Sequence, residues 1–92
     1  MTIPVHMDFE NNVLRLGDEV LTSDLDKRGG FIRRGEVIKL CPSAVRIRIR
    51  RTNLLHGDES EQDIMRSGGY IALVSHNPGR EAELLNGPTI EL

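Results

Sequence analysis

The segment from Val45 to Arg50 constrains the fold more than any other part of the sequence. Val45, Ile47 and Ile49 alternate with three arginines over these six residues. Successive side chains of a strand point to opposite faces of a sheet, and β-branched residues favour strands. The alternation therefore predicts a strand that has one face in an apolar core and the other covered by guanidinium groups.

The rest of the sequence predicts further short strands separated by turns that contain Gly, Asn or Pro. Expected strands cover residues 5–9, 13–16, 19–22, 31–40, 70–75 and 89–92. We expect a tight turn at residues 10–12, where asparagine tolerates a positive φ, a polar loop at 23–30 and a hairpin connection at 41–44. Gly35 is expected to form a bulge. The 70–75 strand, apolar on both faces, is expected to be central or covered by a helix.

Two segments predict helical structure. Residues 58–66 start with Asp58 and Ser60, either of which suits an N-cap, and they carry acids in the first turn, where the helix dipole favours them. A helical turn is expected at residues 80–85.

The amount of apolar side chain limits the size of the fold. The chain has 92 residues, of which 38% are hydrophobic, and only three aromatics. That suffices for one small domain over residues 1–92. The expected fold class is mainly β, as a small barrel or a rolled antiparallel sheet with one short helix.

Charge is strongly segregated along the chain. The nine cations of residues 27–51 are Lys27, Arg28, Arg33, Arg34, Lys39, Arg46, Arg48, Arg50 and Arg51, and the only acid there is Glu36. That segment carries a charge of +8 and the rest of the chain −10, although the net charge is −2. A basic patch matters more for partner choice than the average charge. These nine residues are therefore the candidate site for nucleic acid or for a protein partner.

The arginine row at Arg46, Arg48 and Arg50 has three interpretations. Side chains two residues apart on a strand are about 6.6–7 Å apart, which is comparable to the spacing of phosphates along a nucleic-acid strand. Arginine also binds phosphate through two parallel hydrogen bonds. Alternatively, the row keeps an exposed strand soluble, or it pairs internally with the acids at Asp58, Glu59, Glu61 and Asp63. The scarcity of aromatics for base stacking favours contacts to the backbone over base reading.

No residue pattern predicts catalysis, a metal site or a cofactor. His6, His56 and His76 are dispersed, and the acidic run at 58–63 lacks the glycine and the final glutamate of a calcium loop. Cys41 is alone, so it has no partner for an internal disulfide or a CxxC pair. We expect a protein that is not an enzyme and has no metal or cofactor.

One stretch of the sequence resembles a known family. Within residues 16–51, Gly17-Asp18-Glu19-Val20 is followed by the basic loop Lys27-Arg28-Gly29-Gly30 and then by Gly35-Glu36-Val37. This succession is similar to that of SH3-like barrels of the KOW type, whereas the residues after 51 do not follow the pattern. The resemblance implies an SH3-like barrel, a fold found in ribosomal proteins, transcription elongation factors and peptide-binding modules. A fold of this kind does not by itself fix the function.

These observations lead to one preferred function and one alternative. The preferred function is the binding of nucleic acid, RNA or DNA, or of a ribonucleoprotein through the arginine-rich strands. The alternative is a protein-interaction module, such as a phage-borne regulator that docks on a larger machine. No apolar run approaches the roughly 20 residues that span a bilayer, and the first residues lack the pattern of a signal peptide. We therefore expect a cytoplasmic protein without membrane contact.

Overall fold

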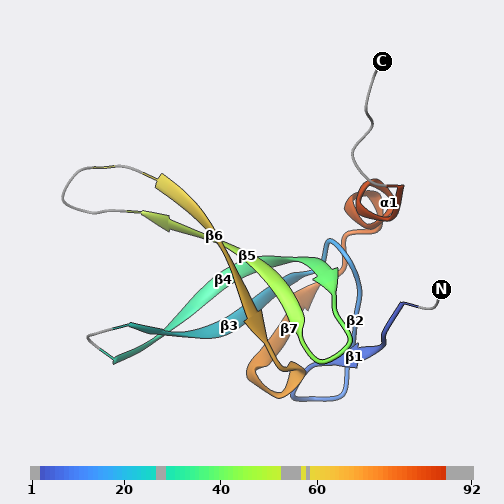
Figure 1. The fold of residues 1–92 in the computed structure, drawn as a ribbon, viewed down its shortest axis with the longest axis horizontal. Coiled ribbons are helices and arrows are strands. Elements are labelled where there is room, and N and C mark those ends of the chain that lie inside the picture. Colours follow the sequence, from blue (N-terminus) through green and yellow to red (C-terminus); the bar gives the residue numbers. More distant parts are fainter. Residues whose placement is uncertain (1–2, 27–28, 53–56, 58, 87–92) are drawn as a thin grey trace.

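Five strands form one antiparallel sheet, and two more form a separate small hairpin (Figure 1). The computed structural model describes residues 3–26, 29–52, 57 and 59–86. In chain order the elements are β1 (His6–Met7), β2 (Val13–Leu14), β3 (Glu19–Asp26), β4 (Gly29–Leu40), β5 (Val45–Thr52), β6 (Glu59–Arg66), the 3-10 turn η1 (Gly68–Tyr70), β7 (Ile71–Ser75) and α1 (Pro78–Asn86). The large sheet has the order β6-β5-β4-β3-β7, and β1 pairs with β2. The expected mainly β fold with one short helix is confirmed.

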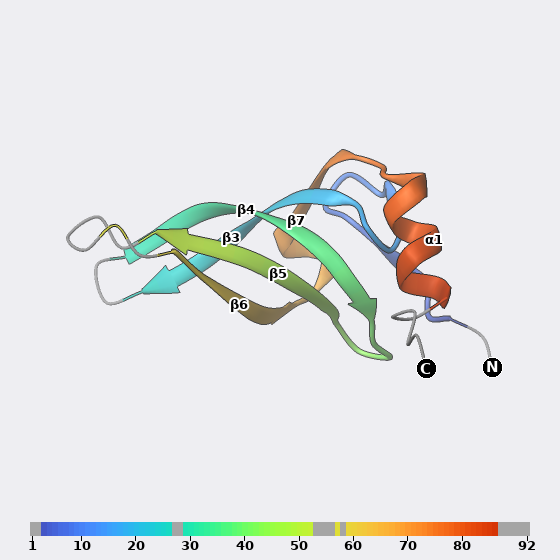
Figure 2. The same cartoon turned by 90° about the horizontal axis from the view of Figure 1, so that it is seen from above.

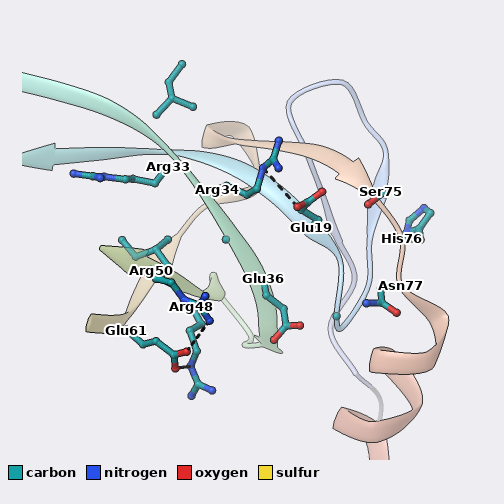
Figure 3. A pocket seen from close by; sticks show the side chains of 14 residues that line it. Glu19, Arg33, Arg34, Glu36, Arg48, Arg50, Glu61, Ser75, His76 and Asn77 are labelled. Atoms are coloured by element: carbon teal, nitrogen blue, oxygen red, sulfur yellow. Dashed lines mark ion pairs between the residues drawn. The ribbon is translucent and has the colours of Figure 1, made fainter. Parts of the chain in front are cut away.

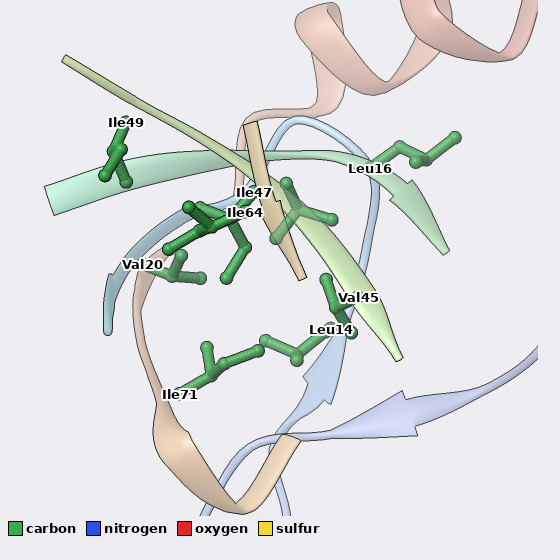
Figure 4. Packing of buried hydrophobic residues seen from close by; sticks show 9 residues of the cluster. Leu14, Leu16, Val20, Val45, Ile47, Ile49, Ile64 and Ile71 are labelled. Atoms are coloured by element: carbon green, nitrogen blue, oxygen red, sulfur yellow. The ribbon is translucent and has the colours of Figure 1, made fainter. Parts of the chain in front are cut away.

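The core lies under one face of this sheet and is entirely aliphatic (Figure 4). Its buried members are Leu14, Leu16, Val20, Val37, Val45, Ile47, Ile49, Ile64 and Ile71. The apolar side chains of β5 are fully buried, whereas the arginines between them are exposed, which confirms the predicted orientation of this strand. Leu84 of α1 packs against the same core, so the helix extends it.

The large sheet is rolled. β6 and β3 are separated by two strands in the hydrogen-bonding order, yet the Arg66 guanidinium on β6 donates a hydrogen bond to the Ser23 carbonyl oxygen on β3 at 3.0 Å. The short turn η1 then leads from β6 directly to β7 at the opposite edge. Across the described residues no strand ladder joins β6 to β7. Of the two expected forms, the structure therefore has the rolled antiparallel sheet.

The helix expected over residues 58–66 is wrong, because Glu59–Arg66 is the edge strand β6. Its register sets Asp63 opposite Arg48 and Glu61 opposite Arg50. It also places the side chain of Ile64 in the core. The acids that suit a helix start thus pair with the arginines of β5. A helix of nine residues is marginal on its own, so tertiary pairing decides the conformation.

The strand expected over residues 70–75 is present as β7, but its expected central or helix-covered position is wrong. β7 lies at the edge of the sheet and pairs only with β3 among the strands. Ile71 is buried, but Val74 is 44% exposed. The outer edge of β7 is covered by the turn after β1. There, the Phe9 N–H donates to the Ile71 carbonyl oxygen at 3.1 Å, and the Leu73 N–H donates to Asp8 Oδ2 at 2.9 Å.

Several elements have other bounds than predicted, whereas the turns predicted at residues 10–12 and 41–44 are present. The tight turn before β2 has a positive φ of 66° at Asn11, and the Cys41 N–H closes the β4–β5 turn on the Ala44 carbonyl oxygen at 2.9 Å. The expected helical turn at 80–85 is contained in α1. β1 and β2 are shorter than predicted. The strand expected at 89–92 lies outside the described residues.

The polar loop expected at 23–30 is wrong over its described residues, because β3 and β4 continue their pairing to Asp26 and Gly29. β7 pairs with β3 only as far as Thr22, and β5 pairs with β4 only as far as Gly35. Residues 23–26 and 29–32 are therefore a two-stranded ribbon, here called the β3–β4 arm. Residues 50–52 and 59–61 form a second one, the β5–β6 arm. Both arms extend away from the end that carries α1 (Figures 1 and 2).

Gly35 is the point of β4 at which atoms of β5 come closest to the backbone. The bulge expected there lies instead between Val37 and Lys39. The reason for glycine is the close approach of β5, because a Cβ on Gly35 would lie 2.5 Å from Ile47 Cγ2 and 3.0 Å from the Arg48 carbonyl oxygen.

Gly35→Ala should therefore destabilise the protein by about 1–3 kcal/mol, the usual cost of an overpacked core. Urea unfolding measures this free energy. Gly69→Ala is the matched control, because a Cβ at Gly69 meets nothing within 4 Å, and its cost should stay within about 0.5 kcal/mol. Equal costs at both positions would contradict the packing of β4 on β5.

Candidate nucleic-acid interface

The sheet face opposite the core, here called the outer face, gathers most of the described candidate cations. Directly paired positions of antiparallel strands share a face. Arg48 of β5 pairs with Glu36 of β4 and with Asp63 of β6, and Arg46 pairs with Lys39 across the bulge. Arg34, Lys39, Arg46, Arg48 and Arg50 all lie on this face and are exposed.

The other candidate cations are placed differently. Arg33 pairs with Thr22, whose side chain is buried, so Arg33 leaves β4 on the side opposite to Arg34. Arg51 pairs with Ser60 in the β5–β6 ladder. Lys27 and Arg28 lie outside the described residues. The structure thus brings together five of the nine predicted residues on one face.

Carboxylates from the neighbouring strands contact three of these arginines. Arg48 Nε lies 3.0 Å from Asp63 Oδ1 and 3.8 Å from Glu61 Oε2. Arg50 Nη2 lies 3.5 Å from Glu61 Oε1, and Arg34 Nε lies 3.5 Å from Glu19 Oε1. The internal pairing considered from the sequence is therefore present at the Glu61 and Asp63 positions. These pairs are exposed, so each stabilises the fold by at most about 1 kcal/mol.

The strongest of these contacts is the one between Arg48 and Asp63. Their hydrogen bond, together with the negative charge of Asp63, raises the pKa of Arg48. The contact thus reinforces the positive charge that an arginine carries in any protein. An incoming anion meets a cation that already has a carboxylate partner and must compete with it.

A groove with a volume of about 800 Å³ is lined by residues of β3, β4, β5 and β6, mostly from the outer face, and Arg33 borders it from the other side of β4 (Figure 3). Its polar lining consists of four arginines, three carboxylates, the last residue of β7 and the two residues after it: Arg33, Arg34, Arg48, Arg50, Glu19, Glu36, Glu61, Ser75, His76 and Asn77. In Figure 3, Arg34 reaches Glu19 on one side, while Arg48 and Arg50 meet Glu61 on the other. The groove therefore offers guanidinium groups to an extended anionic chain.

The wall of the groove beyond β7 is fixed by a buried acid. The Asp18 carboxylate accepts a hydrogen bond from the Arg15 N–H at 2.7 Å and lies 2.9 Å from His76 Nδ1. Arg80 of α1 completes this side, because its Nε lies 3.1 Å from Glu36 Oε2. Glu36 and Asp18 thus tie the start of α1 to the sheet.

Lys39 and Arg46 differ from the other cations of the outer face. Within the described part of the chain, neither forms an ion pair. They pair with each other across β4 and β5, next to the turn at 41–44.

Sequence reasoning missed the groove residues on the acidic side and after β7. Glu19, Glu36, Ser75 and Asn77 carry no signal in the sequence, because only the fold brings them to β4 and β5. The alternation of Glu59, Glu61 and Asp63 could have been read as a strand complementary to the arginine row. Apolar residues are sparse in that segment, and this hid the pattern.

Three negative findings complete the description. The described residues hold no group of three or more side chains that could bind a metal ion. None of their helices is both long and apolar enough to cross a membrane. No family model, curated protein or solved structure matches the chain.

Proposed function

We propose that the protein binds nucleic acid through the outer face of β4 and β5, by contacts to the phosphate backbone. The observation that carries this proposal is the convergence of Arg34, Lys39, Arg46, Arg48 and Arg50 on one open face. Arginine forks match phosphate geometry, and a row of cations follows a linear anion. Nothing in this arrangement reads bases, so we expect weak dependence on sequence.

The resemblance to SH3-like barrels of the KOW type supports the same proposal. Four strands of the large sheet, β3 to β6, follow one another as antiparallel neighbours, and the Gly17-Asp18 turn precedes the first of them. Gly29 and Gly30 of the basic loop in the resemblance begin β4, whereas its two cations, Lys27 and Arg28, lie outside the described residues. We take the fold to be an open relative of that barrel, with the outer face as its binding surface.

The salt dependence of binding tests this function. Fluorescence anisotropy with a labelled duplex, at several salt concentrations, gives the slope of log K against log salt. Replacing Lys39, Arg46, Arg48 and Arg50 by Gln should flatten that slope by at least about 1.8, at about 0.9 for each lost phosphate contact.

Arg15→Gln is the control for the salt experiment, because Arg15 is an exposed cation away from this face and forms no described ion pair. It should leave the slope unchanged. A wild-type slope that survives the fourfold replacement would show that the outer face does not bind nucleic acid.

A second candidate function, docking on a protein, is favoured by exposed apolar residues around the β1–β2 hairpin. Met7 and Val13, a cross-strand pair, are 48% and 43% exposed, and their neighbours Val5 and Phe9 are 71% and 59% exposed. Apolar patches of this kind mark protein interfaces. A stoichiometric protein partner that is lost on Val5→Ser and Phe9→Ser, with no nucleic-acid binding, would support this alternative.

A further inference from the structure

Three of the five cations on the outer face, Arg34, Arg48 and Arg50, contact a carboxylate. Arg48 lies between Glu36 and Asp63 in the ladder, and Arg50 lies opposite Glu61. Cation faces carboxylate at each of these positions. The ladder sets like charges opposite each other at two places, Glu19 opposite Glu36 and Lys39 opposite Arg46. The two glutamates each contact an arginine, Arg34 and Arg80, whereas Lys39 and Arg46 have no carboxylate partner among the described residues.

The strand β6, on the other side of β5, supplies no carboxylate opposite Arg46. The residue of β6 opposite Arg46 is Met65, which is neutral and 41% exposed. Among the described residues no carboxylate forms an ion pair with Lys39 or Arg46, and both side chains are exposed. Like charges directly opposite each other destabilise a sheet. A like-charge pair that no described carboxylate compensates departs from this local rule, and such departures are expected at functional sites.

We propose that Lys39 and Arg46 form the primary phosphate-binding pair of this face. This inference rests on the proposed function and names the contact that makes it work. A phosphate placed between the two side chains receives the arginine fork and the lysine point charge, and it relieves their mutual repulsion. No existing ion pair has to be broken.

Arg48 and Arg50 then contribute less to the binding of the phosphate backbone. Arg48 and Arg50 follow Arg46 along β5 at intervals of about 6.6–7 Å, so a backbone anchored at Arg46 meets them in succession. Each of them must exchange a carboxylate for a phosphate. The free energy gained there is the difference between two similar contacts, and it is therefore small.

Two double variants with the same change in charge distinguish the contribution of Lys39 and Arg46 to binding from that of Arg48 and Arg50. Lys39→Gln with Arg46→Gln should flatten the salt slope by about 1.8, because each phosphate contact contributes about 0.9 to the slope. If the affinity at 1 M salt is unchanged, this corresponds to binding that is about 60-fold weaker at 0.1 M salt. Arg48→Gln with Arg50→Gln should lose less than half of that slope. The probe is a labelled duplex, measured by anisotropy between 50 and 200 mM salt.

A stability measurement accompanies the binding experiment. The urea midpoint of the Lys39/Arg46 double variant should equal or exceed that of the wild type, because a repulsion is removed. The midpoint of the Arg48/Arg50 double variant should fall, because ion pairs with Glu61 and Asp63 are lost. This readout also shows that both variants are folded.

The outcomes distinguish the inference from the function on which it rests. Equal losses of affinity in the two double variants, or a larger loss in the Arg48/Arg50 variant, overturn the inference and leave nucleic-acid binding in place. A wild-type protein that binds neither duplex nor single strand at 50 mM salt overturns the proposed function itself.

Discussion

Ile47→Ala should lower the free energy of unfolding by about 2–5 kcal/mol, the usual cost of truncating a buried isoleucine. Ile47 has no exposed surface and lies on β5, between β4 and β6 in the sheet. It packs within the aliphatic core beside Val37 and Ile64, its partners on those two strands. The cavity left by truncation would therefore open at the centre of the sheet. Urea denaturation monitored by circular dichroism measures the change.

Arg46→Ala is the matched control for this substitution. Arg46 is the neighbour of Ile47 along the strand, is exposed and forms no described ion pair. Its replacement should change stability by no more than about 0.5 kcal/mol. Comparable costs at both positions would mean that the strand is shifted by one residue, since such a shift exchanges the two faces.

Asp8→Ala should be the second large effect, because one buried carboxylate joins the β1–β2 hairpin to the edge of the sheet. Its Oδ1 accepts hydrogen bonds from the Glu10 and Asn12 N–H groups at 2.9 and 2.8 Å, and its Oδ2 accepts one from the Leu73 N–H at 2.9 Å. Removing it leaves the half-buried Leu73 N–H without an acceptor. That orphaned group alone costs about 1–3 kcal/mol.

The ionisation of Asp8 gives this effect a pH dependence. Burial alone would raise the pKa of its carboxyl group, but the hydrogen bonds from Leu73, Asn12 and Glu10 outweigh burial and lower the pKa from its ordinary value of 3.8. The stabilisation is therefore complete above that value and is lost as the pH falls through the lowered pKa. The difference in stability between wild type and Asp8→Ala should shrink between pH 7 and pH 3.

Glu10→Ala is the control for the pH experiment, because it removes the same charge from an exposed side chain two residues away. Its unfolding free energy should follow that of the wild type at both pH values. A difference between wild type and Asp8→Ala that stays constant with pH would contradict the role of the ionised carboxylate.

The parts of the fold that could be predicted are those with a strong local pattern. The alternation at Val45–Arg50 fixed the orientation of β5, and Asn11 marked a turn that requires a positive φ. The hairpin turn at 41–44 follows from Pro42, which has no N–H to donate to a ladder. In each case the physical preference lies within a few residues.

The parts that could not be predicted depend on contacts between distant residues. Glu59–Arg66 has helix-favouring acids at its start, and only the arginines of β5 make it a strand. Asp8 looks like an ordinary turn residue, and its bond to Leu73 spans 65 positions of the chain. The candidate cations were identified from the sequence, but their division into paired and unpaired ones depends on the register of three strands.

The two arms imply that different parts of the outer face open locally at different free energies. A two-stranded ribbon is marginally stable on its own, so the pairing at 23–26 with 29–32 and at 50–52 with 59–61 opens at a much lower free energy than the five-stranded part of the sheet. Lys39 and Arg46 lie where β4, β5 and β6 pair with one another, whereas Arg50 lies at the base of an arm. Amide protons should thus exchange with solvent in two populations, fast in the arms and slow around Ile47. A ligand held first at Lys39 and Arg46 then orders the arms. This ordering has an entropic cost that reduces affinity, but it lets the arms adjust to ligands of different shape.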